Sequence, residues 1–349
     1  MAYLEVKNLS VSFSHPEGRI LAVRGVSFSL APGETLAVVG ESGSGKTVTC
    51  RALMTLLPKN ASIDSGEILL DGKNILALSR RDKRYLRGRD IAMVFQDPMT
   101  SLDPTMRIGL QIEEAVKQHA KISRSEAKKR TGELLSLVGI QEPEKRSRQY
   151  PHEFSGGQRQ RIVIAIALAS NPKILIADEP TTALDVTMQA QVIELLKELQ
   201  KKIKTSIIFI THDLGVVANV ADRVAVMYGG RIIESGLSEE IFYDPRHPYT
   251  WGLLNAMPVL DEGSKTLYSI PGSPPILLNT VKGDPFAPRN EYALEADFCR
   301  EPPLFKVSDT HYAATWLLDP RAPQVQKPGA LERRRKEYLA RSSYNDAGL

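Results

Sequence analysis

Cysteine is scarce in this chain, and long apolar runs are missing. Its 349 residues contain only Cys50 and Cys299, too few for a disulfide framework or a zinc site and typical of a reducing cytosol. The longest apolar run, Ile162–Ala169, is far shorter than the roughly 20 residues that cross a bilayer. The N-terminus lacks the basic and apolar regions of a signal peptide. If the protein acts at a membrane, we therefore expect a peripheral subunit.

A strong charge of either sign is also missing. The 45 basic residues exceed the 41 acidic ones by only four, and the interspersed signs give no reason to expect nucleic acid as a partner. One basic run, Arg333–Lys336, lies within Leu331–Ala340; we interpret it as part of a solvated terminal helix rather than a surface for membrane or nucleic acid. An apolar content of 42% is ordinary for a soluble protein, and the length predicts about two domains.

Hydrophobic periodicity predicts two kinds of strand. Apolar and polar residues alternate through residues 3–30, as in antiparallel strands with one solvated face. Ile174–Ala177 and Ser206–Ile210 are uniformly apolar, as strands of a buried parallel sheet are, and residues 186–203 between them have helical spacing. The run Val48–Leu57 is predicted to be helical and to stop before the following proline.

The residue pattern changes at two further points along the chain. Residues of about 97–157 form a helical insert, in which Ser123 and Glu126 are spaced as a capping box. Beyond residue 256 the chain becomes rich in proline and lacks long periodic segments. We therefore predict an α/β domain over residues 1–256, with the helical insert as a subdomain, and a smaller extension over residues 257–349.

Residues 40–47 match the Walker A pattern in full. They read Gly40, Glu41, Ser42, Gly43, Ser44, Gly45, Lys46 and Thr47. The stretch follows an apolar run and precedes a helix, so its backbone N–H groups and the positive helix end are expected to bind the phosphates of ATP. Lys46 is expected to contact the β- and γ-phosphates as a catalytic residue, and Thr47 to supply a hydroxyl to Mg²⁺. Thr49 is assigned to the same nucleotide-binding set.

A second glycine-rich cradle for an anion lies far along the chain. It reads Phe154, Ser155, Gly156, Gly157 and Gln158, and it precedes a long apolar helix. One nucleotide does not need two such cradles from one chain. The pair makes sense if two ATPase domains meet face to face and each lends its second cradle to the ATP of the other.

Polar residues end three apolar strands and complete a catalytic set. Asp178 and Glu179 end one of them, where a buried carboxylate is costly unless it is paired or binds a metal. Beside a Walker A loop, Asp178 is expected to bind Mg²⁺ and Glu179 to act as general base on the attacking water. His212 is expected to hydrogen-bond the γ-phosphate and hold that water, and Gln96 to reach Mg²⁺ or water.

Together these motifs resemble those of the ABC ATPases. The resemblance implies a P-loop ATPase of the α/β class, with a mixed parallel core sheet, an antiparallel β subdomain and a helical subdomain. It implies that Ser155 and its neighbours bind the γ-phosphate of the partner's ATP, and that Asp185 belongs to a loop crossing the dimer interface. Phe13 stands where the family stacks an aromatic ring, usually tyrosine, on adenine; a core position for Phe13 is equally open.

Three further segments resemble the oligopeptide and dipeptide importer ATPases: residues 97–104, Tyr150–Phe154 and His247–Leu254. The resemblance covers essentially the whole chain and implies ATP and Mg²⁺ as cofactors. It implies four partners: a second, homologous ABC ATPase in a heterodimer, two transmembrane permease subunits and an extracytoplasmic peptide-binding protein. The chain is then expected to be peripheral, on the cytoplasmic face of the cell membrane. Nickel and glutathione importers share many of these segments and remain the alternative.

In one respect the chain departs from this family. Many relatives hold an iron–sulfur cluster with four cysteines of the extension, but the corresponding positions here are Asp284, Asn290 and Thr315, and only Cys299 remains. One thiolate does not hold a cluster that takes four, so no iron–sulfur cluster is expected.

Two other classes of function fit the sequence less well. A soluble ABC ATPase that acts on ribosomes or nucleic acid usually has two cassettes or long coiled coils, whereas this chain has one cassette and no sustained heptads. A non-hydrolysing regulatory subunit does not need the intact Glu179 and His212.

Overall fold

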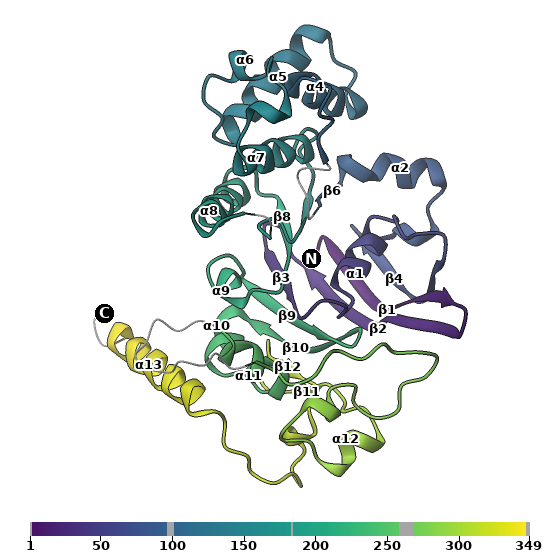
Figure 1. The fold of residues 1–349 in the computed structure, drawn as a ribbon, viewed down its shortest axis with the longest axis vertical. Helices are drawn as coiled ribbons and strands as arrows, with labels where there is room; N and C mark the ends of the chain where they lie inside the picture. Colours follow the sequence, from purple (N-terminus) through teal and green to yellow (C-terminus); the bar gives the residue numbers. More distant parts are fainter. Residues whose placement is uncertain (1, 96–100, 183, 258–268, 347–349) are drawn as a thin grey trace.

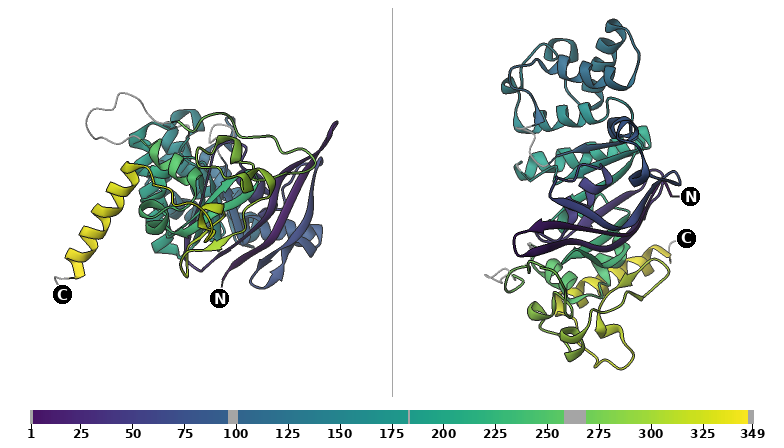
Figure 2. Two further views of the ribbon diagram at one scale, coloured as in Figure 1. Left: turned by 90° about the horizontal axis from the view of Figure 1, so that it is seen from below. Right: turned by 90° about the vertical axis from the view of Figure 1, so that its right-hand side faces the viewer.

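The computed structural model describes residues 2–95, 101–182, 184–257 and 269–346. A helical lobe, the β-sheets and the C-terminal extension follow one another along the long axis of the molecule (Figures 1 and 2).

A mixed eight-stranded sheet forms the centre, with strand order β11-β12-β10-β9-β3-β8-β7-β6. Strands β6, β7, β8, β3 and β9 run parallel, and β10, β12 and β11 add antiparallel pairs. The bounds are β3 Thr35–Val39, β6 Ile91–Val94, β7 Ile174–Asp178, β8 Ser206–Thr211, β9 Arg223–Tyr228, β10 Arg231–Leu237, β11 Phe305–Lys306 and β12 Tyr312–Ala313. The two uniformly apolar segments are thus confirmed as buried parallel strands.

A second, antiparallel sheet of order β2-β1-β4-β5 covers one face of the first. Its strands are β1 Leu4–His15, β2 Gly18–Leu30, β4 Ala61–Leu70 and β5 Lys73–Asn74; the short helix η1 Ile75–Ala77 and helix α2 Arg80–Arg89 follow. Helix α1 (Lys46–Leu53) lies between the two sheets, where Leu36 and Val38 of β3 pack with Leu9 of β1. The alternation of residues 3–30 is confirmed as a pair of antiparallel strands.

The helical lobe is built from the segment that the sequence predicts to be helical. Its elements are α4 Ile108–His119, α5 Arg124–Leu137, α6 Pro143–Arg146, η2 Pro151–Glu153 and α7 Gly156–Ala167. The predicted capping box of Ser123 and Glu126 opens α5. The core of the lobe is continuous with the face of the central sheet that α7 and α8 (Val186–Ile203) cover. The lobe is therefore fixed to the strands that carry Asp178 and His212.

Shorter elements and the extension cover the remaining part of the central sheet. They are α9 Leu214–Val217, α10 Ser238–Tyr243, α11 Pro248–Asn255, η3 Ala287–Arg289, α12 Glu295–Cys299, η4 Trp316–Leu318 and α13 Gly329–Asp346. The extension continues the sheet, because Ala313 of β12 pairs with Glu234 of β10. It also reaches β2, where the Leu21 N–H donates to the Leu277 carbonyl at 2.8 Å. The predicted C-terminal helix forms, and its Leu331 is buried in a hydrophobic cluster with Phe242 and Trp251.

One predicted helix ends earlier than expected. Helix α1 ends at Leu53 rather than running to Leu57. Thr55 follows the cap in the left-handed region (φ 52°), its N–H donates to the Ala52 carbonyl, and the Leu56 N–H donates to the Arg51 carbonyl. This is a Schellman ending with threonine at the position that glycine usually occupies. No proline or glycine marked it in the sequence.

Three short polar residues close turns of the extension. The side-chain oxygens of Asp284, Asn290 and Thr315 each accept a hydrogen bond from the backbone N–H two residues on, at 3.0, 3.0 and 3.3 Å. Such turns are what short polar side chains support locally. Cys299 is exposed. These residues organise the extension through hydrogen bonds, and the expectation of no iron–sulfur cluster stays a prediction.

The Asp284 carboxyl makes the stability of the fold depend on pH. Burial raises its pKa to about 6 from 3.8, helped by the Asp297 carboxylate and opposed by the Phe286 N–H. The folded chain thus keeps a proton that the unfolded chain releases. This contribution to stability is complete below pH 3.8 and is lost as the pH rises through about 6.

We expect Asp284→Asn to stabilise the protein above pH 6, because it removes the buried charge and keeps the acceptor for the turn. The free energy of unfolding should exceed that of the wild type by roughly 1–3 kcal/mol near pH 8, and the gain should vanish near pH 4. Urea unfolding across this range measures it. Asp309→Asn, at a side chain that is 98% exposed, is the control. A gain that does not change with pH would contradict the assignment.

Candidate functional site

The glycine-rich loop 40–47 joins the carboxyl end of β3 to the first turn of α1. Gly45 caps the helix with φ 101°, and a Cβ there would lie 2.4 Å from the Ala22 carbonyl oxygen. A Cβ at Gly40 would lie 2.2 Å from the Met227 carbonyl oxygen. Only glycine fits at both positions. The loop therefore brings its backbone to a helix N-terminus, where anions bind.

Lys46 is buried inside this loop, and its ammonium group supplies the positive charge there. Its Nζ donates to the carbonyl oxygens of Gly40 and Glu41 at 2.6 and 2.9 Å, and to Ser44 Oγ at 3.3 Å. Burial lowers the pKa of Lys46, and the carboxylates of Glu179 and Asp178 act in the opposite direction. The ammonium is thus fixed by three loop oxygens at the place where phosphates are expected.

A hydroxyl and a carboxylate meet beside the loop. Thr47 Oγ1 donates to Asp178 Oδ1 at 3.2 Å, and Asp178 is 4% exposed at the end of β7. Burial raises the pKa of Asp178, whereas the hydrogen bond from Thr47 lowers it. Oxygens of these two kinds are ligands that Mg²⁺ takes together with phosphates and water, so the two residues fit this ion.

Glu179 and His212 end neighbouring strands and face each other. His212 Nδ1 lies 3.3 Å from Glu179 Oε1, and the Thr182 hydroxyl donates to Glu179 Oε2 at 2.9 Å. Glu179 has a left-handed backbone (φ 48°), a costly conformation of the kind that clusters at active sites. Its side chain is 16% exposed and that of His212 is 55% exposed. The carboxylate is therefore held in place while the imidazole is open to solvent.

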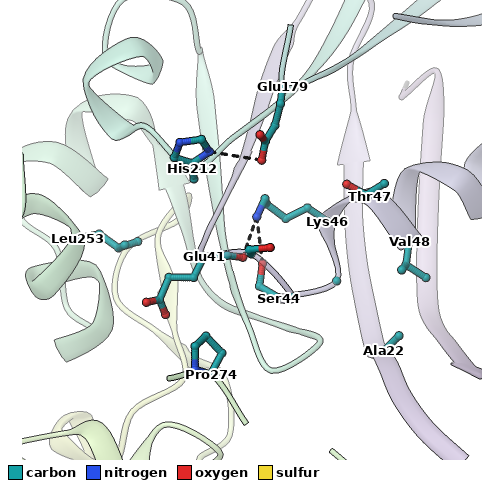
Figure 3. A pocket seen from close by; sticks show the side chains of 13 residues that line it. Ala22, Glu41, Ser44, Lys46, Thr47, Val48, Glu179, His212, Leu253 and Pro274 are labelled. Atoms are coloured by element: carbon teal, nitrogen blue, oxygen red, sulfur yellow. Dashed lines mark hydrogen bonds and ion pairs between the residues drawn. The ribbon is translucent and has the colours of Figure 1, made fainter. Parts of the chain in front are cut away.

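These groups share one cavity of about 830 Å³, shown in Figure 3. Residues 41–48, from the loop and the start of α1, line it; Glu179 and His212 lie together on one side, and Pro274 of the extension lies on another. Ala22 and Leu253 complete the lining. The volume is within the range of small-molecule and cofactor sites.

The second glycine-rich cradle is not part of this cavity. Ser155 caps α7, accepts from the Gln158 N–H and donates its own N–H to the Gln158 side chain, so the cradle is a helix N-terminus with a capping box. Ser155, Gly156 and Gln158 do not line the cavity. Asp185 caps α8 in the same way, through the Met188 N–H. Both groups lie outside the chain's own phosphate loop.

The other predicted site residues have different surroundings. The Thr49 hydroxyl donates to the Gly45 carbonyl at 2.9 Å and so ties α1 to the loop. Thr49 does not line the cavity. Phe13 is half-buried on β1 and is also outside the lining. Gln96 lies outside the described residues.

Known families match both parts of the chain. Residues 23–182 match the family described as ABC transporter, and residues 233–299 match the one described as oligopeptide/dipeptide transporter, C-terminal region. The oligopeptide transport ATP-binding protein OppD of Bacillus subtilis is 63% identical over 94% of this chain and 92% of its own length. The dipeptide transport ATP-binding protein DppD of Lactococcus lactis is 60% identical over 92% and 93%. The chain belongs to the ABC transporter ATP-binding proteins of the oligopeptide/dipeptide transporter family.

Solved structures agree with this membership in an ABC ATPase family. The ATP-binding cassette MJ0796, in a dimeric post-hydrolysis state bound to ADP and Pi, superposes with a TM-score of 0.60 at 28% identity; the match covers 67% of this chain and 98% of that one. CbiO1 from Clostridium perfringens gives a TM-score of 0.61 at 32% identity over 70% and 91%. The predicted fold class is therefore confirmed, and the protein is an ABC-type ATPase that binds ATP.

Sequence reasoning missed the residues that join this ABC ATPase cassette to its extension. Pro274 lines the nucleotide cavity, Tyr249 binds the Glu41 backbone, and Arg289 binds the Glu41 carboxylate. Their segments are recognisable as family markers. Their contacts with the loop had no local signal, because Arg289 is 248 positions away from Glu41.

Among the helices that the structure describes, we find none with both the length and the apolar character to cross a bilayer.

Proposed function

We propose that this chain is the ATP-hydrolysing subunit of a membrane importer for oligopeptides or dipeptides. The observation that carries the proposal is the Glu179–His212 pair at 3.3 Å, which shares a cavity with the Lys46 loop. The cargo class comes from the names of relatives that are 60–63% identical along nearly the whole chain. These relatives favour peptides over nickel or glutathione.

The loop and its neighbours bind the nucleotide in this proposal. Lys46 contacts the β- and γ-phosphates, and the backbone of residues 40–47 and the N-terminus of α1 receive the remaining phosphate charge. Thr47 and Asp178 would hold Mg²⁺, with Gln96 as a further predicted ligand. When bound, the ion neutralises charge on the phosphates.

Glu179 accepts the proton of the attacking water. Thr182 and His212 orient its carboxylate at 2.9 and 3.3 Å. A positioned base of this kind contributes about 10²–10⁴-fold to the rate. The more exposed His212 hydrogen-bonds the γ-phosphate and holds the attacking water in position.

The Ser155 cradle and Asp185 act on a second ATPase. Because neither lines the chain's own cavity, we assign them to the ATP held by a homologous partner, as the cassette architecture implies. Closure on ATP and reopening after hydrolysis then favour two states of the permeases in turn. The complete importer contains two such ATPases, two transmembrane subunits and an extracytoplasmic peptide-binding protein, with this chain on the cytoplasmic face of the membrane.

Trapping the assembled complex tests this proposal. Tagged Glu179→Gln protein with ATP should retain, from gently solubilised membranes, a second ABC ATPase, two permeases and a peptide-loaded binding protein. The same preparation without ATP should retain less of the second ATPase. Recovery of ribosomes or nucleic acid without membrane subunits would overturn the transport function.

A further inference from the structure

We propose that the C-terminal extension is part of the ATP site, in which Arg289 positions the phosphate loop through Glu41 and thereby sets the affinity for ATP. This inference rests on the proposed ATPase function. It makes Arg289 a positioning residue, since it contacts Glu41.

Arg289 binds Glu41 through both terminal nitrogens. Nη1 donates to Glu41 Oε2 at 2.7 Å, and Nη2 donates to Oε1 at 2.9 Å. A bidentate pair of this kind fixes orientation as well as distance. The Arg289 side chain is 5% exposed and that of Glu41 is 29% exposed. Loss of one partner would leave the other charge poorly compensated, so the pair constrains where Glu41 can lie.

Arg289 is itself held from two other directions. Its Nε donates to the Pro271 carbonyl at 2.7 Å, and Nη1 donates to the Tyr228 hydroxyl at 3.2 Å at the end of β9. Nη2 also contacts the Gly272 carbonyl at 3.3 Å. The guanidinium therefore connects the phosphate loop to the central sheet and to the segment that precedes Pro274.

Glu41 passes this constraint on to the catalytic lysine. Its backbone N–H donates to the Tyr249 hydroxyl at 2.8 Å, and its carbonyl accepts from Lys46 Nζ at 2.9 Å. A shift of the Glu41 backbone thus moves an oxygen that fixes the ammonium. Pro274 and the Glu41 side chain lie on the same side of the cavity in Figure 3. The extension both anchors the loop and lines the site.

A purely structural role for Arg289 gives a different result. If it only attached the extension, its loss would lower the melting temperature and leave the KM for ATP unchanged. Glu301 offers the matched control, because it joins the extension to Arg24 and Arg231 and does not line the cavity. Glu301→Gln removes the two ion pairs of Glu301 between the extension and the cassette, and Glu301 does not contact Glu41.

We would measure ATPase kinetics and the binding of a fluorescent ATP analogue with the full-length chain. Arg289→Ala should raise both KM and Kd by about tenfold, with a much smaller change in kcat. Arg289→Lys should restore part of the affinity, since lysine keeps the charge but not the fork. Glu301→Gln should keep the wild-type KM. An Arg289→Ala protein with wild-type KM and Kd would overturn the inference.

Arg289→Gln keeps the test decisive if Arg289→Ala does not fold. It keeps a polar side chain and removes the charge and the fork that hold the Glu41 carboxylate. Its KM should rise about fivefold, the value of one hydrogen bond; an unchanged KM would overturn the inference. A wild-type chain that hydrolyses no ATP would instead refute the proposed function itself.

Discussion

Substitution of Glu179 by glutamine is expected to lower ATP hydrolysis by about three orders of magnitude and to leave ATP binding intact. Glutamine keeps the size of the side chain and an oxygen for the Thr182 hydroxyl, which donates to Glu179 at 2.9 Å. Its amide does not accept a proton from water. The loss should therefore fall on kcat, while the Kd for ATP remains near that of the wild type.

The comparison needs a carboxylate that does not face the cavity. Glu194 lies on α8 with a side chain that is 66% exposed, so Glu194→Gln should hydrolyse ATP at the wild-type rate. Single-turnover hydrolysis and binding of labelled ATP separate the chemical step from affinity. Wild-type turnover by Glu179→Gln would refute the assignment of Glu179 as general base. Loss of binding together with turnover would place Glu179 in nucleotide binding instead.

Periodicity over many residues predicted the fold well. The alternation of residues 3–30 gave two antiparallel strands, and the uniformly apolar Ile174–Ala177 and Ser206–Ile210 gave two central strands. The segment 186–203 coincides with α8. Burial on one or both faces of a sheet leaves a repeating pattern of this kind, so each segment carried its own signal.

Details that depend on single residues were harder to predict. Helix α1 ends where Thr55 adopts a left-handed conformation. Because glycine is the usual residue at such a position, a threonine gave no sign of the ending. The Walker residues were predicted because their chemistry needs a fixed local order, and the structure brings Lys46, Glu179 and His212 to one cavity. The roles of Ser155 and Asp185 stay predictions, because they concern a second chain.

Contacts between distant segments left no signal in the sequence. Arg289 approaches Glu41 in the folded chain, where β12 extends the central sheet and the Leu21 N–H of β2 donates to the Leu277 carbonyl of the extension. A proline-rich stretch shows neither periodicity nor a preferred partner. Local patterns therefore did not predict the contact of the extension with the ATP site, because tertiary packing brings these segments together.

Replacement of Lys46 by alanine is expected to weaken ATP binding by about two orders of magnitude, the value of one or two hydrogen bonds to a charged group. The substitution removes the cation and also removes one donor from each of three loop oxygens, which lie 2.6, 2.9 and 3.3 Å from Lys46 Nζ. The lost cation weakens phosphate binding directly, and the lost hydrogen bonds weaken the loop that binds the phosphates. The Kd for ATP should therefore rise, independently of the chemical step.

The Lys46→Arg variant distinguishes the need for a positive charge from the need for a side chain that fits inside the loop. The site around Nζ is built from close oxygens, and Lys46 is 5% exposed, so a planar guanidinium should not fit there without moving the loop. We therefore expect Lys46→Arg to bind ATP poorly despite its charge, whereas Lys128→Ala, at an exposed position of α5, should bind normally. Equilibrium binding of a fluorescent ATP analogue measures all three. Tight binding by Lys46→Arg would mean that charge alone is required; tight binding by Lys46→Ala would remove this lysine from the nucleotide site.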